Sequence, residues 1–276
     1  MQKEQIVFRI PKGVQIVANV FRLPGASNLL QQRPITLMFG HANSAHKELW
    51  DPIISNIIDK ASETSSSNFY LEKIIAFDFS TMGDSAILNR DLLNNLDSEQ
   101  MRPTTFKAII CVEPVLVSGL RFASDSTPIS PMTLRRKNDF KSPDEIEKYF
   151  KSRTVYKPWH PDSLDIHIKH ALYEEKSQDG LVYKLKCHPA IEAATYDGSF
   201  YACRLFWEKQ HLIRCPLTLV TGNENSYLKH KDAINFVRPL CKGKYINIPR
   251  GGHMLPMEIP DELSSTIIQE IKTFLD

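Results

Sequence analysis

The sequence predicts an α/β protein with a mostly parallel sheet, crossover helices and a mostly helical insertion. Apolar runs of strand length alternate with an amphipathic stretch in the first part of the chain, which is the pattern of strands joined by crossover helices. A charged and aromatic segment with helix signals then runs from Ser118 to Arg214, and apolar runs resume after it. The length of 276 residues fits one such domain with an insertion. We therefore expect a core formed by residues 1–117 and 215–276 and a cap formed by residues 118–214.

The first elements predict the start of this sheet. Ile6–Arg9 and Val14–Phe21 are β-rich runs separated by a Pro-Lys-Gly turn, so they predict an antiparallel pair. Pro34–Phe39 is a continuous apolar run, the pattern of a strand buried on both faces. An amphipathic helix is expected over residues 45–60, because apolar side chains recur there at i, i+3, i+4 and i+7.

The later elements continue the alternation. Further strands are predicted at Lys73–Phe79, Phe106–Pro114, Pro216–Gly222 and Tyr245–Ile248. Helices are predicted near 229–236 and 263–271. Inside the insertion, Ser142 precedes Pro143 and a glutamate at the third helical position, which predicts a capped helix start.

Composition excludes several classes of function. The formal net charge is +2, with 42% hydrophobic and 24% charged residues, so we expect no nucleic-acid partner. Five cysteines form no C-x-x-C pair, so no disulfide framework, metal site or cofactor is expected. No uncharged run approaches the length of a membrane span, and no secretory leader or C-terminal peroxisomal Ser-Lys-Leu signal is visible. These features predict an intracellular, cytoplasmic protein without an integral membrane segment.

His253 is the strongest candidate for a catalytic group. It follows Gly251 and Gly252, between the last predicted strand and the last predicted helix. Glycines allow a sharp turn, and a histidine on such a turn can project its imidazole over the end of a sheet and act as a general base. The alternative is a histidine that only fills the turn.

Five segments together resemble a known family. They are Gly40–Trp50, Met82–Ala86, Val112–Val115, Trp159–Pro161 and Gly251–His253. They are similar to a fungal branch of the α/β-hydrolase superfamily that includes peroxisomal serine lipases and hydrolases linked to fungal toxin biosynthesis. The resemblance implies an α/β-hydrolase fold, a small apolar ester or lipid as ligand, acyl transfer, and relatives placed in the peroxisome. It covers most of the chain, including the cap.

The resemblance also assigns roles to residues. His253 corresponds to the general base, and the backbone N–H groups of the loop His41, Ala42 and Asn43 correspond to the oxyanion hole. Cap aromatics would line an acyl pocket, among them Phe140, Tyr149, Phe150, Trp159 and Tyr183.

Two positions compete for the carboxylate that orients the base. Glu113 ends a predicted strand at the edge where the site should open, and Glu224 lies in the loop after the next strand. The position in that loop that often carries an aspartate is Asn225 here. Glu113 is preferred and Glu224 remains the alternative.

The motif that defines this fold's nucleophile is absent from the sequence. A nucleophile elbow needs a strand, a Gly-x-Ser-x-Gly turn and a helix, and the chain contains no Gly-x-Ser-x-Gly. Residues 80–105 contain no apolar run of strand length, and each crossover needs about a dozen residues or more. We therefore expect a deletion near Leu93–Met101, direct pairing of the two strands that would flank the lost one, and marginal stability.

Three explanations remain open. The sequence is an incomplete version of a competent serine hydrolase, or a non-catalytic pseudohydrolase that binds a small apolar ligand, or a hydrolase in which Ser85 serves as a displaced nucleophile. Cys111 is a weaker candidate because a thiol inside an apolar strand is usually inert. The remaining histidines, including His160, His167 and His170, are expected on the cap surface or in its packing.

Overall fold

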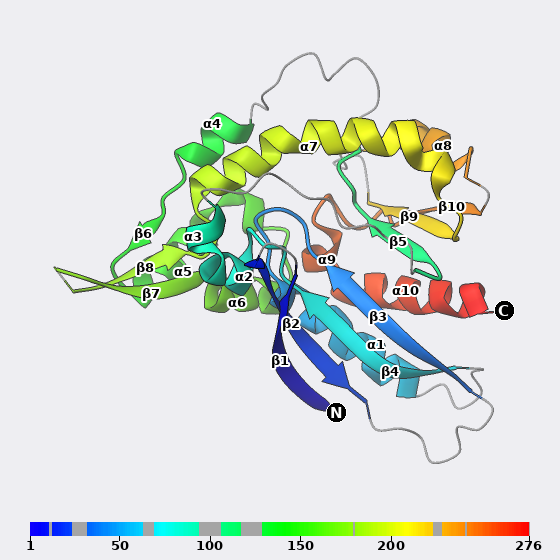
Figure 1. Ribbon diagram of the computed structural model, residues 1–276, viewed down its shortest axis with the longest axis horizontal. Coiled ribbons are helices and arrows are strands. Elements are labelled where there is room, and N and C mark those ends of the chain that lie inside the picture. The colour runs from blue at the N-terminus through cyan, green and yellow to red at the C-terminus, as the bar shows by residue number, and fades with distance from the viewer. Residues whose placement is uncertain are drawn as a thin grey trace.

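The first half of the main sheet has four strands. The computed structural model describes residues 1–10, 13–23, 32–62, 69–93, 106–116, 129–178, 180–222, 228–240 and 242–275. Strands β1 (Gln2–Arg9), β2 (Gln15–Arg22), β3 (Arg33–Gly40) and β4 (Phe69–Phe77) form a sheet with the order β1-β2-β4-β3. The β1–β2 and β2–β4 pairs are antiparallel and the β3–β4 pair is parallel (Figure 1). The predicted opening antiparallel pair is therefore confirmed.

The second half has three parallel strands. They are β5 (Ile109–Val112), β9 (Leu217–Thr221) and β10 (Gly243–Asn247), in the order β10-β9-β5. All five residues of β9 are buried, as its apolar run predicts. Helix α8 (His230–Val237) connects β9 to β10, which is the expected crossover.

The two half-sheets do not join. In the described part of the chain, β3 and β5 each end their own sheet, so the expected direct pairing of these neighbours is wrong. The prediction that the apolar run of β3 is buried on both faces is also wrong, because Met38 is 52% exposed. Strand pairing would bring β3 and β5 to about 4.8 Å from each other. Both half-sheets pack against one buried cluster, so moving β3 and β5 together would disturb the packing of that cluster.

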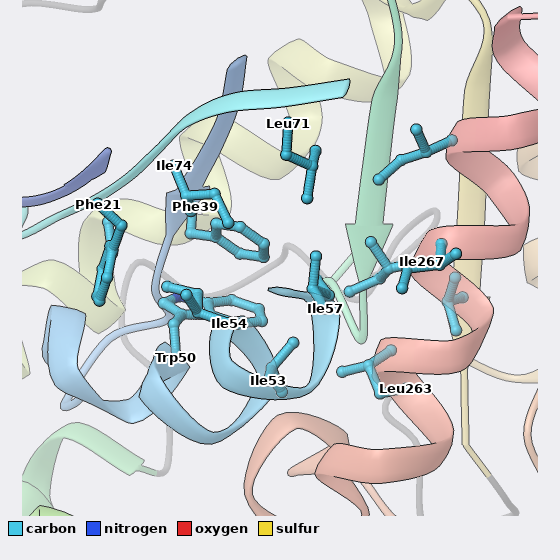
Figure 2. Close-up of a cluster of buried hydrophobic side chains, with 14 of the residues drawn as sticks. Phe21, Phe39, Trp50, Ile53, Ile54, Ile57, Leu71, Ile74, Leu263 and Ile267 are labelled. Atoms are coloured by element: carbon cyan, nitrogen blue, oxygen red, sulfur yellow. The ribbon is translucent and has the colours of Figure 1, made fainter. Parts of the chain in front are cut away.

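That shared core lies under both half-sheets. Helices α1 (Asp51–Ser62) and α10 (Pro260–Leu275) pack against each other, and one buried cluster unites them with strands of both halves. Figure 2 shows isoleucines of α1 and apolar side chains of α10 converging on Phe39 and Leu71. The second half contributes Val220 and Ile248 to the same cluster. The amphipathic helix is confirmed, and a 3-10 turn, η3 (Lys47–Trp50), precedes it.

The segment expected to form the cap contains the predicted helices and an additional small sheet. Its elements are α4 (Ile129–Leu134), β6 (Asp139–Phe140), α5 (Pro143–Ser152), η5 (Thr154–Tyr156), α6 (Pro161–His170), β7 (Leu172–Ser177), β8 (Gly180–Leu185), α7 (Pro189–Lys209) and η6 (Gln210–Leu212). Ser142 caps α5, because its side chain accepts from the Glu145 N–H. The antiparallel sheet β6-β8-β7 was not predicted. Among the described residues, no helix is both long and apolar enough to cross a membrane.

Candidate active site

The loop that carries His253 leaves no room for a side chain at Gly251, and the adjacent end of β9 leaves none at Gly222. It connects β10 to the short helix α9 (Leu255–Glu258). A Cβ on Gly251 would lie 2.3 Å from the Leu255 side chain, and a Cβ on Gly222 would lie 2.4 Å from the Gly251 carbonyl oxygen. The ends of β9 and β10 therefore meet backbone to backbone beneath the histidine.

Glu258 braces this loop from α9. Its carboxylate accepts from the Gly252 N–H at 2.5 Å and from the Met254 N–H at 3.2 Å, the two amides that flank His253. Sequence reasoning missed this role. The signal was the position of a glutamate five residues after the histidine, at the end of the same short helix.

His253 and Glu113 form the central pair of the site. Nδ1 of His253 lies 3.0 Å from Oε2 of Glu113, although 140 residues separate them in the chain. The Glu113 side chain is 3% exposed, and its other oxygen accepts from the Gly222 N–H. Glu113 has a φ of 46°, an uncommon conformation for a non-glycine residue and one that often accompanies a functional site.

This arrangement has a defined chemical consequence. A carboxylate only accepts hydrogen bonds, so it places the proton of a neutral His253 ring on Nδ1 and makes Nε2 the basic nitrogen. It also stabilises the imidazolium that forms when Nε2 takes a proton. The alternative acid, Glu224, and the neighbouring Asn225 lie outside the described residues.

The predicted oxyanion loop follows β3. The His41 ring is buried, where Nδ1 lies 2.8 Å from the Ala42 carbonyl oxygen and Nε2 accepts from the Phe79 N–H at 3.2 Å. The second contact ties the loop to the segment just after β4. Ala42 is exposed and Asn43 is half-buried, so this part of the loop lies at the surface.

The alternative nucleophiles, Ser85 and Cys111, lie in buried environments. Ser85 lies in α2 (Gly83–Leu88) and is fully buried; its hydroxyl accepts from the Val17 N–H at 2.8 Å and donates to the Asp78 carbonyl oxygen at 3.2 Å. Cys111 lies in β5, where burial raises the pKa of its thiol to about 11. Both environments favour a structural role.

The interval where the elbow is expected contains no strand in its described portion. Helix α2 and the short helix α3 (Arg90–Leu93) fill residues 83–93, and residues 94–105 lie outside the description. Five residues separate β4 from α2, so this connection is not the tight strand-to-helix turn that exposes a nucleophile.

A small cavity lies between the loop after β3 and the segment that was expected to form the cap. Its lining includes Ser44, His46, Tyr149, Tyr156 and His167. About 30 Å³ is available in it, room for roughly two water molecules. It is too small for an acyl chain.

The other residues named between positions 118 and 214 take packing and surface positions. Phe140 is fully buried in a cluster with Ile146 and Phe150. His160 caps α6 by accepting from the Asp162 N–H at 3.4 Å, while His167 is buried among aromatic rings. No group of three or more His, Cys, Asp or Glu side chains in the described regions is placed to hold a metal ion.

Comparison with protein-family models and with curated protein sequences gives no match. Solved structures do match. A peroxisomal alpha-beta-hydrolase from Saccharomyces cerevisiae is similar with a TM-score of 0.78 and 17% identity, over 99% of this chain and 86% of that one. The thioesterase domain from the curacin biosynthetic pathway matches with a TM-score of 0.58 and 13% identity, over 97% of this chain and 100% of that one. A haloalkane dehalogenase loop variant from Bradyrhizobium elkanii matches with a TM-score of 0.55 and 13% identity, over 99% and 98%.

These similarities extend over nearly the whole chain and over proteins with different reactions. At such low identity they establish the fold and not the reaction. The strand order of the two half-sheets, the loop after β3 and the late histidine loop agree with that fold. The chain has the α/β-hydrolase fold.

Proposed function

We propose that this chain is of carboxylic ester or lipid hydrolase ancestry and is inactive or strongly impaired as written. His253 is the general base, Glu113 orients it, and the loop His41, Ala42 and Asn43 supplies the oxyanion-hole donors. The nucleophile is the missing part, because the sequence has no Gly-x-Ser-x-Gly. The alpha-beta-hydrolase, esterase and thioesterase structures that the fold resembles support an acyl-transfer ancestry.

The observation that carries this proposal is an intact base and acid beside an interrupted sheet. The His253–Glu113 contact of 3.0 Å has the geometry of a working pair. The break between β3 and β5 falls where the elbow strand of this fold belongs. We infer that one contiguous unit near Leu93–Met101, containing a helix, the strand and the elbow, is lacking from this sequence.

In a product that contains the elbow, the reaction follows the order of a serine hydrolase. The serine hydroxyl attacks the ester carbonyl while Nε2 of His253 takes its proton, and Glu113 stabilises the resulting imidazolium. Backbone N–H groups of the loop after β3 bind the oxyanion. His253 then returns the proton to the leaving alcohol, and water releases the acid by the reverse sequence.

Sequencing the transcript across the codons for residues 93–101 is the direct test. Extra in-frame codons that encode Gly-x-Ser-x-Gly support the proposal. If only the short message exists, the incomplete-product explanation is wrong. The purified chain as written should then be assayed with a short-chain p-nitrophenyl ester. We expect no turnover above a His253→Ala variant, and turnover lost in that variant contradicts the proposed impairment.

The second candidate is a non-catalytic protein that binds a small apolar ligand. The lack of a Gly-x-Ser-x-Gly motif and the buried hydrogen bonds of the Ser85 hydroxyl favour a non-catalytic protein. Such a protein is stabilised by ligand without turnover, so a rise in Tm with fatty acids or alkyl esters would support it. We also assign residues 118–214 to the cap, and predict an intracellular, cytoplasmic protein with no nucleic-acid partner.

A further inference from the structure

A buried pair of histidines joins the loop after β3 to the cap. His46 lies just before η3, and His167 lies on α6. The residues are 2% and 5% exposed. Nε2 of His46 lies 3.3 Å from Nδ1 of His167, and the two rings are nearly parallel, with centroids 5.4 Å apart. The proposed catalytic groups do not include this pair.

The hydrogen bonds of the pair require the His46 ring to be neutral, because its Nε2 must accept. Nδ1 of His46 lies 3.0 Å from Oε2 of Glu48. Burial alone would raise the pKa of Glu48, but the hydrogen bond with His46 and the charge of Lys47 hold it well below its usual range. The carboxylate accepts from Nδ1 of His46, so Nε2 of the neutral ring is an acceptor. His167 therefore donates from Nδ1.

Protonation of the docked pair is unfavourable. The His167 ring contacts the rings of Phe150, Tyr156 and Trp159 at centroid distances of 5.2, 5.5 and 5.3 Å. Burial lowers the pKa of His167 well below its ordinary value of 6.5, and the neighbouring His46 and Arg136 lower it further. Burial also lowers the pKa of His46, although Glu48 opposes this shift.

The other charged groups around the pair are compensated. Lys47 is fully buried and its ammonium group contacts Glu48, Asp78 and Asp84 at 2.8, 2.9 and 2.6 Å. On the cap side, Lys186 contacts Asp84 at 2.5 Å and Arg136 pairs with Glu192. The remaining titratable neighbours are His41 beside Asp78, His170 beside His46, and the Tyr149, Tyr156 and Cys187 side chains of the cavity wall. Burial lowers the pKa of His170, and the nearby Glu48 opposes this shift.

The carboxylates do not titrate in the range where histidine does. Burial opposes ionisation of Asp78 and Asp84, but their contacts hold both pKa values below the usual range: His41 and Lys47 for Asp78, and Lys186 and Lys47 for Asp84. Between pH 7.5 and 5.5 the groups that can gain protons when this contact opens are therefore the histidines.

We propose that His46 and His167 form an acid-released latch, which holds the cap on the loop that carries His41, Ala42 and Asn43. The folded pKa values are depressed, so the latch contributes fully above pH 6.5 and weakens as the pH falls below it. Each proton bound only by the undocked form makes docking about tenfold less favourable per pH unit. Acid thus uncovers the loop, and neutral pH keeps it covered.

Hydrogen exchange of α6 at pH 7.5, 6.5 and 5.5, corrected for the intrinsic exchange rate, tests the latch. We expect the opening equilibrium to rise about tenfold or more between pH 6.5 and 5.5. His167→Gln retains an amide that can donate to His46 but cannot titrate, so its pH response should be smaller, and what remains should come from His46 and His170. His211→Gln, at an exposed site in η6, is the matched control and should behave like the unsubstituted protein. An unchanged pH response in His167→Gln overturns the proposal.

A second measurement needs no variant. Two-bond ¹H–¹⁵N spectra of the imidazoles report the protonation and tautomer of each ring directly. At pH 6 we expect His46 and His167 to be neutral with the proton on Nδ1. Titration of His167 near pH 6.5 in the docked protein would refute the latch even if His167→Gln does not fold.

Discussion

Replacing Lys47 by methionine removes the only cation that contacts three carboxylates within the described core. The Lys47 side chain is fully buried and lies within 3 Å of Glu48, Asp78 and Asp84. Removing one partner of a buried ion pair costs about 3–5 kcal/mol, because the remaining charge stays buried without compensation. In a domain of this size each kcal/mol shifts Tm by about 2–4 °C. We therefore expect a fall of roughly 6–20 °C.

The pH dependence of this loss separates electrostatics from packing. In the unsubstituted protein the pKa values of Asp78 and Asp84 are lowered, against the effect of burial, by contacts that include Lys47. Without Lys47, burial should raise them. A raised folded pKa gives a contribution to stability that is present at low pH and is lost as the pH rises. The difference in unfolding free energy should therefore shrink between pH 7 and pH 4.5.

Urea unfolding followed by tryptophan fluorescence at pH 7 and pH 4.5 measures both quantities. Lys157→Met is the control, because Lys157 is exposed and has no ion pair in the described part of the chain. It should change the unfolding free energy by no more than about 0.5 kcal/mol. A loss below about 1 kcal/mol in Lys47→Met, or a loss that is equal at the two pH values, would refute the reasoning.

Three other substitutions, the first with a matched control, test the packing of the site and the break in the sheet. Gly222→Ala places a Cβ 2.4 Å from the Gly251 carbonyl oxygen, so thermal melts should show a loss of about 1–3 kcal/mol in unfolding free energy. Gly198→Ala is the control: it lies inside α7 with open space around it and should raise the unfolding free energy by up to about 1 kcal/mol. Ser85→Ala leaves the buried Val17 N–H without its hydroxyl acceptor, and we expect a loss of about 1–3 kcal/mol in urea melts; a neutral result would count against the structural role. Met38→Lys puts a charge on the exposed edge strand β3, so light scattering should show slower aggregation at unchanged Tm, and an unchanged aggregation rate would contradict the importance of this edge.

The sequence predicted where the strands lie in the chain but not how deeply each of them is buried. The apolar runs of β3 and β9 look alike, and both form strands. Yet β9 is buried throughout while β3 is mostly exposed, because β9 has a neighbour on each side and β3 has one only. Burial of a parallel strand depends on partners elsewhere in the chain, which a local pattern does not contain.

The hairpin β7–β8 was missed although a signal was present. An Asp-Gly dipeptide, whose glycine is the first residue of β8, is a common turn signal in sequences, although Gly180 itself pairs with Ser177 in the structure. The charges in these strands obscured the alternation of apolar and polar residues. In the structure, Glu175 and Lys184 pair with each other across the hairpin.

Two of the residues named for the site lie at strand ends and are brought together by the fold. Glu113 contacts His253, whereas Glu224 lies outside the described residues, so the choice of acid stays a prediction. The cluster around Lys47 could not be predicted, because lysine is almost never fully buried unless paired, and its partners come from separate elements. Whether these residues catalyse a reaction stays a prediction.

The division of the sheet also determines the order in which its parts are completed during synthesis. Every strand of the first half lies before residue 78, whereas the second half requires residue 247. At about 5–20 residues per second, a ribosome takes roughly 10–35 s to make the stretch between them. During that time the apolar face of α1 awaits α10, while β3 presents an edge that also stays open in the finished structure. We therefore expect the nascent chain to expose apolar surface that chaperones can bind until the second half of the sheet has been synthesised.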